Sequence, residues 1–234
     1  SISGGRLPPC ILHTMESDQS NTNSGFTLIE LMVVLAIIAV VASIVLSSQN
    51  SFNKTLTLTN TTYDIALTIL NAETYGISSR AAGIMTNAGY GVHFQKTSAN
   101  SFTFFADTYP LPSTSSVCHP IDDPSAPNAR PGNCIYDSSK GEGITDHVLG
   151  NGITISKFCS YAIGSWSCSD NGLTSLDIVF ARPNASPFIS ANGAYSASFP
   201  ITAACLTVSS PQGGSRFISV SSYGQITANA PSCP

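Results

Sequence analysis

The hydrophobic pattern of the chain is dominated by one long apolar run near its start. Residues 26–46 read FTLIELMVVLAIIAVVASIVL, and Glu30 is their only charged residue. As an α-helix the run would extend about 31 Å, which matches a bilayer hydrocarbon core of about 30 Å. It is too long for the apolar core of a simple signal peptide. The pattern therefore predicts a membrane-spanning helix.

Helical periodicity continues into the more polar residues 47–80. Apolar side chains recur there at intervals of three, four or seven, which places them on one helix face. These side chains are Phe52, Leu56, Tyr63, Ala66, Leu70 and Ile77. We expect an amphipathic continuation of the membrane helix, packed on the rest of the protein by this face. Ala81-Ala82-Gly83 then offers a stop.

Residues 81–234 show a different pattern, typical of short β-strands. Six segments are rich in aromatic or β-branched residues and are bounded by Gly, Pro, Asn or Ser. They are Tyr90–Gln95, Ser101–Ala106, Gly152–Phe158, Leu176–Phe180, Ile201–Val208 and Arg216–Ser221. The proline-rich stretch Tyr109–Gly132 is expected to form a long loop. The predicted fold class is α+β: a long N-terminal helix, transmembrane and then amphipathic, packed on an antiparallel β-sheet domain.

Residues 1–25 are polar and irregular, and they are left out of the fold prediction. Position 1 is Ser, so Met15 is a candidate for the true start, with Met15–Gly25 as a short leader. The predicted organisation is a leader at 1–25, a membrane helix at 26–46, an amphipathic helix at 47–80 and a β-rich head at 81–234 with its loop at 109–132.

Composition narrows the class of protein further. Charged residues make up only 9% of the chain, against about 25% in an average soluble protein. A polar but weakly charged surface suits an exported protein that packs against copies of itself. The nine basic residues are scattered, so we do not expect the chain to bind nucleic acid.

Six of the seven cysteines follow the apolar run, which indicates disulfides formed in an oxidising compartment. One possible set of pairs is Cys118–Cys134, Cys159–Cys168 and Cys205–Cys233. Gly164 would turn a hairpin inside the second of these pairs. Six cysteines allow fifteen connectivities, so other pairings stay open. Buried free thiols in a reducing cytosol are the alternative.

The start of the apolar run, GFTLIEL at residues 25–31, resembles the processing site of type IV prepilins and type II secretion pseudopilins. The resemblance implies that a membrane prepilin peptidase cuts between Gly25 and Phe26 and methylates the new amino group of Phe26. It also implies that Glu30, the fifth mature residue, sets the axial register during assembly. One departure is that Met15–Gly25 has no basic residue, whereas leaders in this family usually carry them.

The charge pattern around Glu30 agrees with this resemblance. A carboxylate in a membrane helix costs roughly 2.5–3.5 kcal/mol and normally has a partner. No Lys or Arg lies between residues 7 and 53, so the amino group of a cleaved Phe26 is the obvious cation. Two other interpretations stay open: a signal anchor with Glu30 at the water interface, and a secretory signal cut after Ala42.

The predicted head is similar, more diffusely, to the H-type minor pseudopilins and their type IV pilus counterparts. The segments that carry this likeness are Asp64–Tyr75, Gly89–Phe94, Phe104–Asp107, Asp177–Phe180 and Arg216–Ile226, with a hairpin turn at Gly224. The resemblance implies a structural filament subunit, minor in one branch of the family and major in the rival branch. Implied partners are other pilin or pseudopilin subunits, the prepilin peptidase and the assembly platform. The implied location is the bacterial inner membrane, crossed once with the head outside, and then an extracellular or periplasmic filament.

The alternative function is that of a pilus-associated adhesin or a DNA-uptake receptor. The aromatic side chains that could stack on bases are Phe102, Phe104, Phe105 and Tyr109. No basic groove is expected beside them, which is why nucleic acid is an unlikely partner.

Enzyme activity is not expected. The candidate groups His93, His119 and His147 accompany no Gly-x-Ser-x-Gly or His-Glu-x-x-His motif. No cofactor or metal site is predicted either, although an oxygen-rich loop leaves calcium as a possibility. Its carboxylates would come from Asp122, Asp123, Asp137, Glu142 and Asp146.

Overall fold

The structure is a computed structural model that divides into two compact units, residues 1–47 and 48–234. It describes residues 25–78, 80–83, 87–109, 131–183 and 185–234, and the side chains of residues 47–54 lie outside this description. Helix α1 (Leu28–Ile77) begins in the first unit and ends in the second. The two units are described separately below.

The described part of the first unit consists mainly of the apolar half of α1. Its span Leu28–Leu46 has a mean hydropathy of 3.0 and is not buried against any other part of the chain. By length and composition this segment could cross a membrane once, in agreement with the membrane helix that the sequence predicts. Its apolar side chains therefore need a lipid bilayer or other molecules to cover them.

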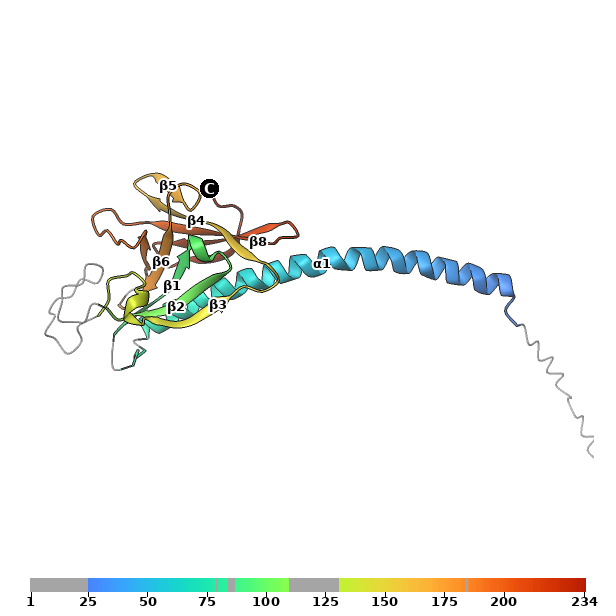
Figure 1. Cartoon of the computed structure of the whole chain (residues 1–234), viewed down its shortest axis with the longest axis horizontal. Helices are drawn as coiled ribbons and strands as arrows, with labels where there is room; N and C mark the ends of the chain where they lie inside the picture. Colours follow the sequence, from blue (N-terminus) through green and yellow to red (C-terminus); the bar gives the residue numbers. More distant parts are fainter. Residues whose placement is uncertain (1–24, 79, 84–86, 110–130, 184) are drawn as a thin grey trace, which may run out of the picture. The chain divides into compact units, whose positions relative to one another are not determined.

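The second unit contains two five-stranded sheets in which all strand pairs are antiparallel (Figure 1). The first sheet has the order β3-β2-β1-β6-β7, from strands β1 (Gly89–Gln95), β2 (Ser101–Asp107), β3 (Gly143–Val148), β6 (Ser175–Phe180) and β7 (Phe188–Ala191). The second has the order β10-β9-β8-β4-β5, from strands β4 (Thr154–Ala162), β5 (Ser165–Cys168), β8 (Ala203–Ser209), β9 (Ser215–Ser221) and β10 (Ile226–Ala230). The predicted α+β class is confirmed.

The strands differ from the sequence prediction in two ways. All six predicted strands are present, but the short strands β3, β5, β7 and β10 were not predicted. The strands also form two sheets where one was expected, because a strongly twisted sheet of about ten strands tends to split into two packed sheets. His147, one of the three candidate histidines, lies in β3. Five of the six residues of β3 are exposed and His147 is half-buried, so the strand lacks the alternation that marks a half-buried strand.

One hydrophobic core joins the second half of α1 to both sheets. The helix contributes Leu58, Ile65 and Ile69, which are at most 2% exposed. The first sheet contributes Phe94 and Phe180 to the same cluster. The second sheet contributes four buried apolar side chains, those of Phe158, Leu206, Val208 and Ile218. The prediction that the amphipathic half of the helix packs on the sheet domain is therefore correct.

The helix face that packs is, however, not the one that the spacing predicted. Leu56, Tyr63, Leu70 and Ile77 are 42%, 48%, 45% and 38% exposed, and only Ala66 of the predicted set with a described side chain is buried. Phe52 lies among the side chains outside the description.

The error has a physical cause in threonine chemistry. Thr62 and Thr68 lie on the buried face although they are polar. The Thr62 hydroxyl donates to Leu58 O at 2.7 Å, and the Thr68 hydroxyl donates to Asp64 O at 2.9 Å. Because these hydroxyls bond within the helix, they enter the core without an unpaired polar group. Helix α1 thus carries apolar side chains on two opposite faces, and periodicity alone did not separate them.

Two of the three predicted disulfides are present. Cys159–Cys168 closes the β4–β5 hairpin around Gly164, which has a φ of 78°. Cys205–Cys233 ties the C-terminal segment to β8. The third predicted pair includes Cys118, which lies outside the described residues, so that pairing stays a prediction. The turn expected at Gly224 also forms between β9 and β10, with a φ of 86°.

Candidate functional site

The first turn of α1 is capped by a side chain from the predicted processing motif. Thr27 precedes the helix, and its Oγ1 accepts a hydrogen bond from Glu30 N at 3.3 Å. Thr27 O accepts a second bond from Leu31 N at 3.2 Å. Thr-x-x-Glu is the capping-box pattern, which satisfies amide groups that a helix start leaves without partners. Glu30 in this first turn also carries the charge that the helix dipole favours there.

Glu30 itself presents an exposed carboxylate. Within the part of the chain that the structure describes, no group donates a hydrogen bond to that carboxylate and no cation pairs with it. From the next residue to Leu46 the span carries no further charge. Phe26, four residues before Glu30, is 83% exposed. The geometry therefore leaves one acid, in an apolar helix, that needs a cation from a cleaved terminus or from another molecule.

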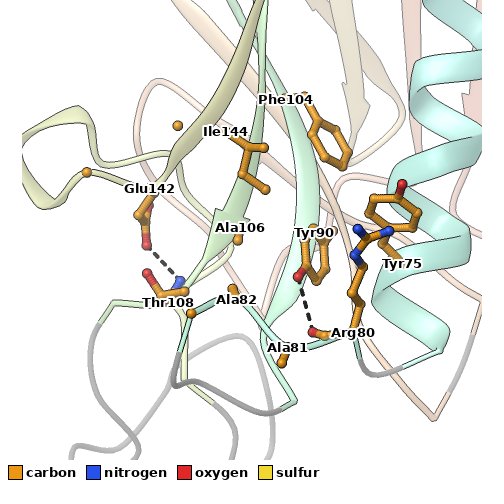
Figure 2. Close-up of a pocket in the computed structure, with 13 residues that line it drawn as sticks. Tyr75, Arg80, Ala81, Ala82, Tyr90, Phe104, Ala106, Thr108, Glu142 and Ile144 are labelled. Atoms are coloured by element: carbon orange, nitrogen blue, oxygen red, sulfur yellow. Dashed lines mark hydrogen bonds between the residues drawn. The ribbon is translucent and has the colours of Figure 1, made fainter.

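A second candidate site is a cavity of about 480 Å³ beside the end of α1 (Figure 2). Tyr75, Tyr90 and Phe104 line it, with ring centroids between 5.5 and 6.0 Å apart. The Arg80 guanidinium lies 4.2 Å from the centroid of the Tyr75 ring. Arg80 O accepts a hydrogen bond from the Tyr90 hydroxyl at 3.1 Å. These contacts fix the chain segment that follows the helix against the first sheet.

Glu142 also lines this cavity but uses both carboxylate oxygens on backbone amides. Its Oε1 accepts from Thr108 N and Tyr109 N, each at 2.9 Å, and its Oε2 accepts from Asp137 N at 2.8 Å. The residue is only 2% exposed. Burial raises the pKa of Glu142 to about 7, while the three amides act in the opposite direction. Its role is to join two loop segments, which leaves it without an oxygen free for a ligand.

A second buried carboxylate holds the start of the segment 131–142. Asp107 is fully buried and accepts from Asn133 N at 2.9 Å and from Cys134 N at 2.7 Å. Gly132 has a φ of 107°, and a Cβ built on it would come within 2.5 Å of the Asp107 carboxylate. Only glycine suits this position, because any side chain would displace the carboxylate from its amide partners.

A third buried carboxylate, Asp177, pairs with His93 across strands β1 and β6. The Asp177 Oδ1 and the His93 Nδ1 lie 2.6 Å apart, and the same oxygen accepts from Tyr136 N at 3.4 Å. Burial raises the pKa of Asp177, and the bond to His93 opposes that shift. His93 was predicted as a candidate for catalysis or metal binding. The structure instead places His93 in a hydrogen-bonded pair with the buried Asp177, which helps to fasten residues 131–142.

The loop carboxylates proposed for calcium are used differently where they are described. Asp137 accepts from Ser139 N and its hydroxyl, and Asp146 accepts from the Thr103 hydroxyl at 2.6 Å. Among the described residues, no group of three His, Cys, Asp or Glu side chains is arranged to hold a metal ion. Asp122, Asp123 and His119 lie outside those residues, so calcium binding stays a prediction.

Comparison with known families adds one finding at the capped helix start. Residues 20–46 match the family model of the prokaryotic N-terminal methylation motif. The chain carries the prepilin-type motif of type IV pilins and pseudopilins. The methylation motif points to a pilin-like or pseudopilin subunit, to assembly with other pilin subunits and to a single membrane anchor. Searches of curated proteins and of solved structures found no match.

The methylation motif was predictable from sequence, but the role of Thr27 in it was not recognised. The signal was present, because Thr27 and Glu30 have the Thr-x-x-Glu spacing before an apolar run. The aromatic cavity and the three buried carboxylates had no comparable local signal. Their members come from segments up to 84 residues apart, as His93 and Asp177 show. Such contacts depend on the sheet order, which the strand pattern alone does not determine.

Proposed function

We propose that the chain is a minor structural subunit of a type IV pilus or of a type II secretion pseudopilus. The observation that carries this proposal is the unpartnered Glu30 carboxylate at the capped start of an apolar helix, inside the methylation motif. A prepilin peptidase cuts between Gly25 and Phe26, and Phe26 becomes the methylated N-terminal residue. The assembly platform then moves the subunit from the inner membrane into the filament.

Cleavage supplies the charge that Glu30 lacks. The new amino group of Phe26 is a cation, and in the growing filament Glu30 of an incoming subunit binds the amino group of the preceding one. A charge-assisted hydrogen bond of this kind is roughly twice as strong as a neutral one. In an apolar surrounding it also sets the axial register, because any other position would leave an acid unpaired.

The exposed face of α1 in the second unit supports assembly as well. We call Leu56, Tyr63, Leu67, Leu70 and Ile77 the outer stripe, and each is between 38% and 53% exposed. A helix that is apolar on both faces is expected to be buried on both. The sheets cover one face, and neighbouring subunits cover the outer stripe in the filament.

The test of this function is intact-mass and N-terminal analysis of the protein purified from its native envelope. The expected chain begins at N-methylated Phe26. A chain that begins at Ser43 would show a secretory signal cut after Ala42, and an uncut chain would show a signal anchor. Either result would overturn the proposal.

A further inference from the structure

The outer face of the second sheet, away from the core, carries two short rows of paired residues. In one row Tyr161 lies opposite Trp166 on one side and opposite Ala203 on the other, and Ala203 lies opposite Ser221. In the next row Cys159 lies between its disulfide partner Cys168 and Cys205, followed by Ser219 and Thr227. The second row crosses all five strands of the sheet, and its three cysteines are buried.

A cavity of about 220 Å³ lies on this surface. Trp166 lines one part of it, and Ser232 and Pro234 of the segment tied down by Cys205–Cys233 line another. The remaining lining residues are small or carry hydroxyl or amide groups. They are Ala203, Ala204, Cys205, Ser219, Val220, Ser221, Gln225 and Thr227. No Asp, Glu, Lys, Arg or His side chain is among the described residues that line the cavity.

The hairpin that carries Trp166 has a strained turn. Ile163 turns the β4–β5 hairpin with a φ of 50° and is 77% exposed. A β-branched residue in the left-handed region is an outlier, since Asn or Gly would adopt that conformation at lower cost. Strain of this kind gathers at ligand-binding positions. Tyr223, in the neighbouring β9–β10 turn, is 89% exposed.

Main-chain hydrogen bonds hold these turns together at one end of the sheet. Thr202 N donates to Tyr161 O, and Ser222 N donates to Thr202 O, each at 2.8 Å. The Tyr161 and Trp166 rings also contact each other, with centroids 5.1 Å apart. The strands β4 and β5 therefore hold the Tyr161 and Trp166 rings in place.

We propose that this cavity binds one ring of an uncharged saccharide. A sugar ring has an apolar face that stacks on an aromatic ring and a rim of hydroxyls that need hydrogen-bond partners. Trp166 offers the ring, and Gln225, Ser221 and Thr227 offer amide and hydroxyl groups. A cavity without basic side chains gives no advantage to an acidic sugar. Its volume is below the 300–1,000 Å³ of pockets for drug-sized ligands, which suits a single unit of a longer glycan.

The chain provides its own probe, because Trp166 is its only tryptophan. Selectively excited tryptophan fluorescence of the full chain in detergent micelles is titrated with a panel of neutral glycans, acidic glycans and short peptides. The expected result is a saturable change with at least one neutral glycan. For that glycan, calorimetry on Trp166→Ala should show binding weakened at least about tenfold, whereas Trp166→Tyr keeps most of it.

Tyr63→Ala removes an exposed aromatic of the outer stripe and is the matched control, with no expected change in binding. A response to acidic glycans or peptides alone, or to no glycan in the panel, would overturn the proposal. So would equal binding by Trp166→Ala. The measurement uses unassembled protein, so its outcome is independent of whether the chain enters a filament.

Discussion

At the residue scale, the proposed assembly mechanism depends on the charge of Glu30. Glu30→Gln keeps the size of the side chain but removes the ion pair with a neighbouring amino group. Charge-assisted bonds contribute about 1.5–3 kcal/mol, so we expect incorporation into filaments to fall about tenfold or more. Cleavage after Gly25 should continue, which mass spectrometry of the membrane fraction would check.

Ser43→Ala is the control for this variant. Ser43 lies in the same apolar span, and its hydroxyl donates only to Ala39 O within the helix. Filament yield, measured by quantitative blotting of sheared fractions, should match that of the unaltered chain. Normal yield from Glu30→Gln would show that the pairing does not drive assembly.

A second residue-scale prediction concerns the pH dependence of the head. The pKa of Glu142 is raised from 4.5 to about 7 in the folded state, chiefly by burial. Between these values the folded state binds more protons than the unfolded one, so the free energy of unfolding falls as pH rises from about 4.5 through about 7. Burial raises the pKa of Asp177 too, and its contribution has the same sign.

Glu142→Gln should make this decline shallower, because the raised group no longer titrates. It should also lower stability at pH 4.5, since the amide nitrogen of Gln cannot accept the bond from Asp137 N. Denaturant titrations in detergent at several pH values measure both effects. Asp170→Asn, whose side chain is 62% exposed, is the control and should leave the slope unchanged. Parallel pH profiles for Glu142→Gln and the unaltered chain would contradict this account.

At the element scale, the two faces of α1 should respond to mutation in opposite ways. Leu67→Ser combined with Leu70→Ser alters only exposed positions of the outer stripe. We expect the free energy of unfolding of the head to change little, within about 1 kcal/mol for the pair, while filament yield falls. Leu58→Ala, on the buried face, should instead cost about 2–5 kcal/mol of stability. Unfolding titrations and filament yield on the same variants separate the two roles.

The same helix shows how far sequence pattern determined the fold. Its existence, its apolar span and its packing on a β domain were all predictable, because each has a strong local signal. The packing face was not, since Thr62 and Thr68 satisfy their hydroxyls inside the helix and so resemble apolar residues in the core. The exposed Leu56, Tyr63 and Leu70 were therefore predicted to be core residues. Strand β3 was not predicted because its residues are almost all exposed and so show no alternation of apolar and polar side chains.

At the scale of the whole molecule, the two described disulfides should contribute unequally to stability. They close stretches with sequence separations of 9 and 28 residues. Loop-closure entropy then gives about 2.6 kcal/mol for Cys159–Cys168 and about 3.6 kcal/mol for Cys205–Cys233. Replacing both cysteines of a pair by Ser, followed by thermal unfolding under oxidising conditions, should lower the melting temperature more for the second pair. A larger effect from the hairpin pair would show that strand pairing outweighs loop length.

Of the candidate sites, only the processing motif at the start of α1 could be predicted, because its residues are neighbours in the sequence. Gly25, Phe26 and Glu30 lie within six consecutive positions, whereas the cavity on the second sheet combines residues from four strands and the C-terminal segment. Its aromatic wall depends on the β4–β5 hairpin, of which β4 and the turn at Gly164 had been predicted but β5, which carries Trp166, had not. Trp166 therefore had no neighbours from which a role could be inferred.

Helix α1 has one more consequence, for the life of the subunit before it assembles. Lipid can shelter the span up to Leu46, but the outer stripe beyond it belongs to the unit that contains the head. In the proposed function, a subunit that has not yet assembled thus exposes an apolar surface, which a neighbouring subunit would cover. If the proposed function holds, we expect subunits made in excess of available neighbours to be less stable in the cell than those in filaments, because their outer stripe stays exposed.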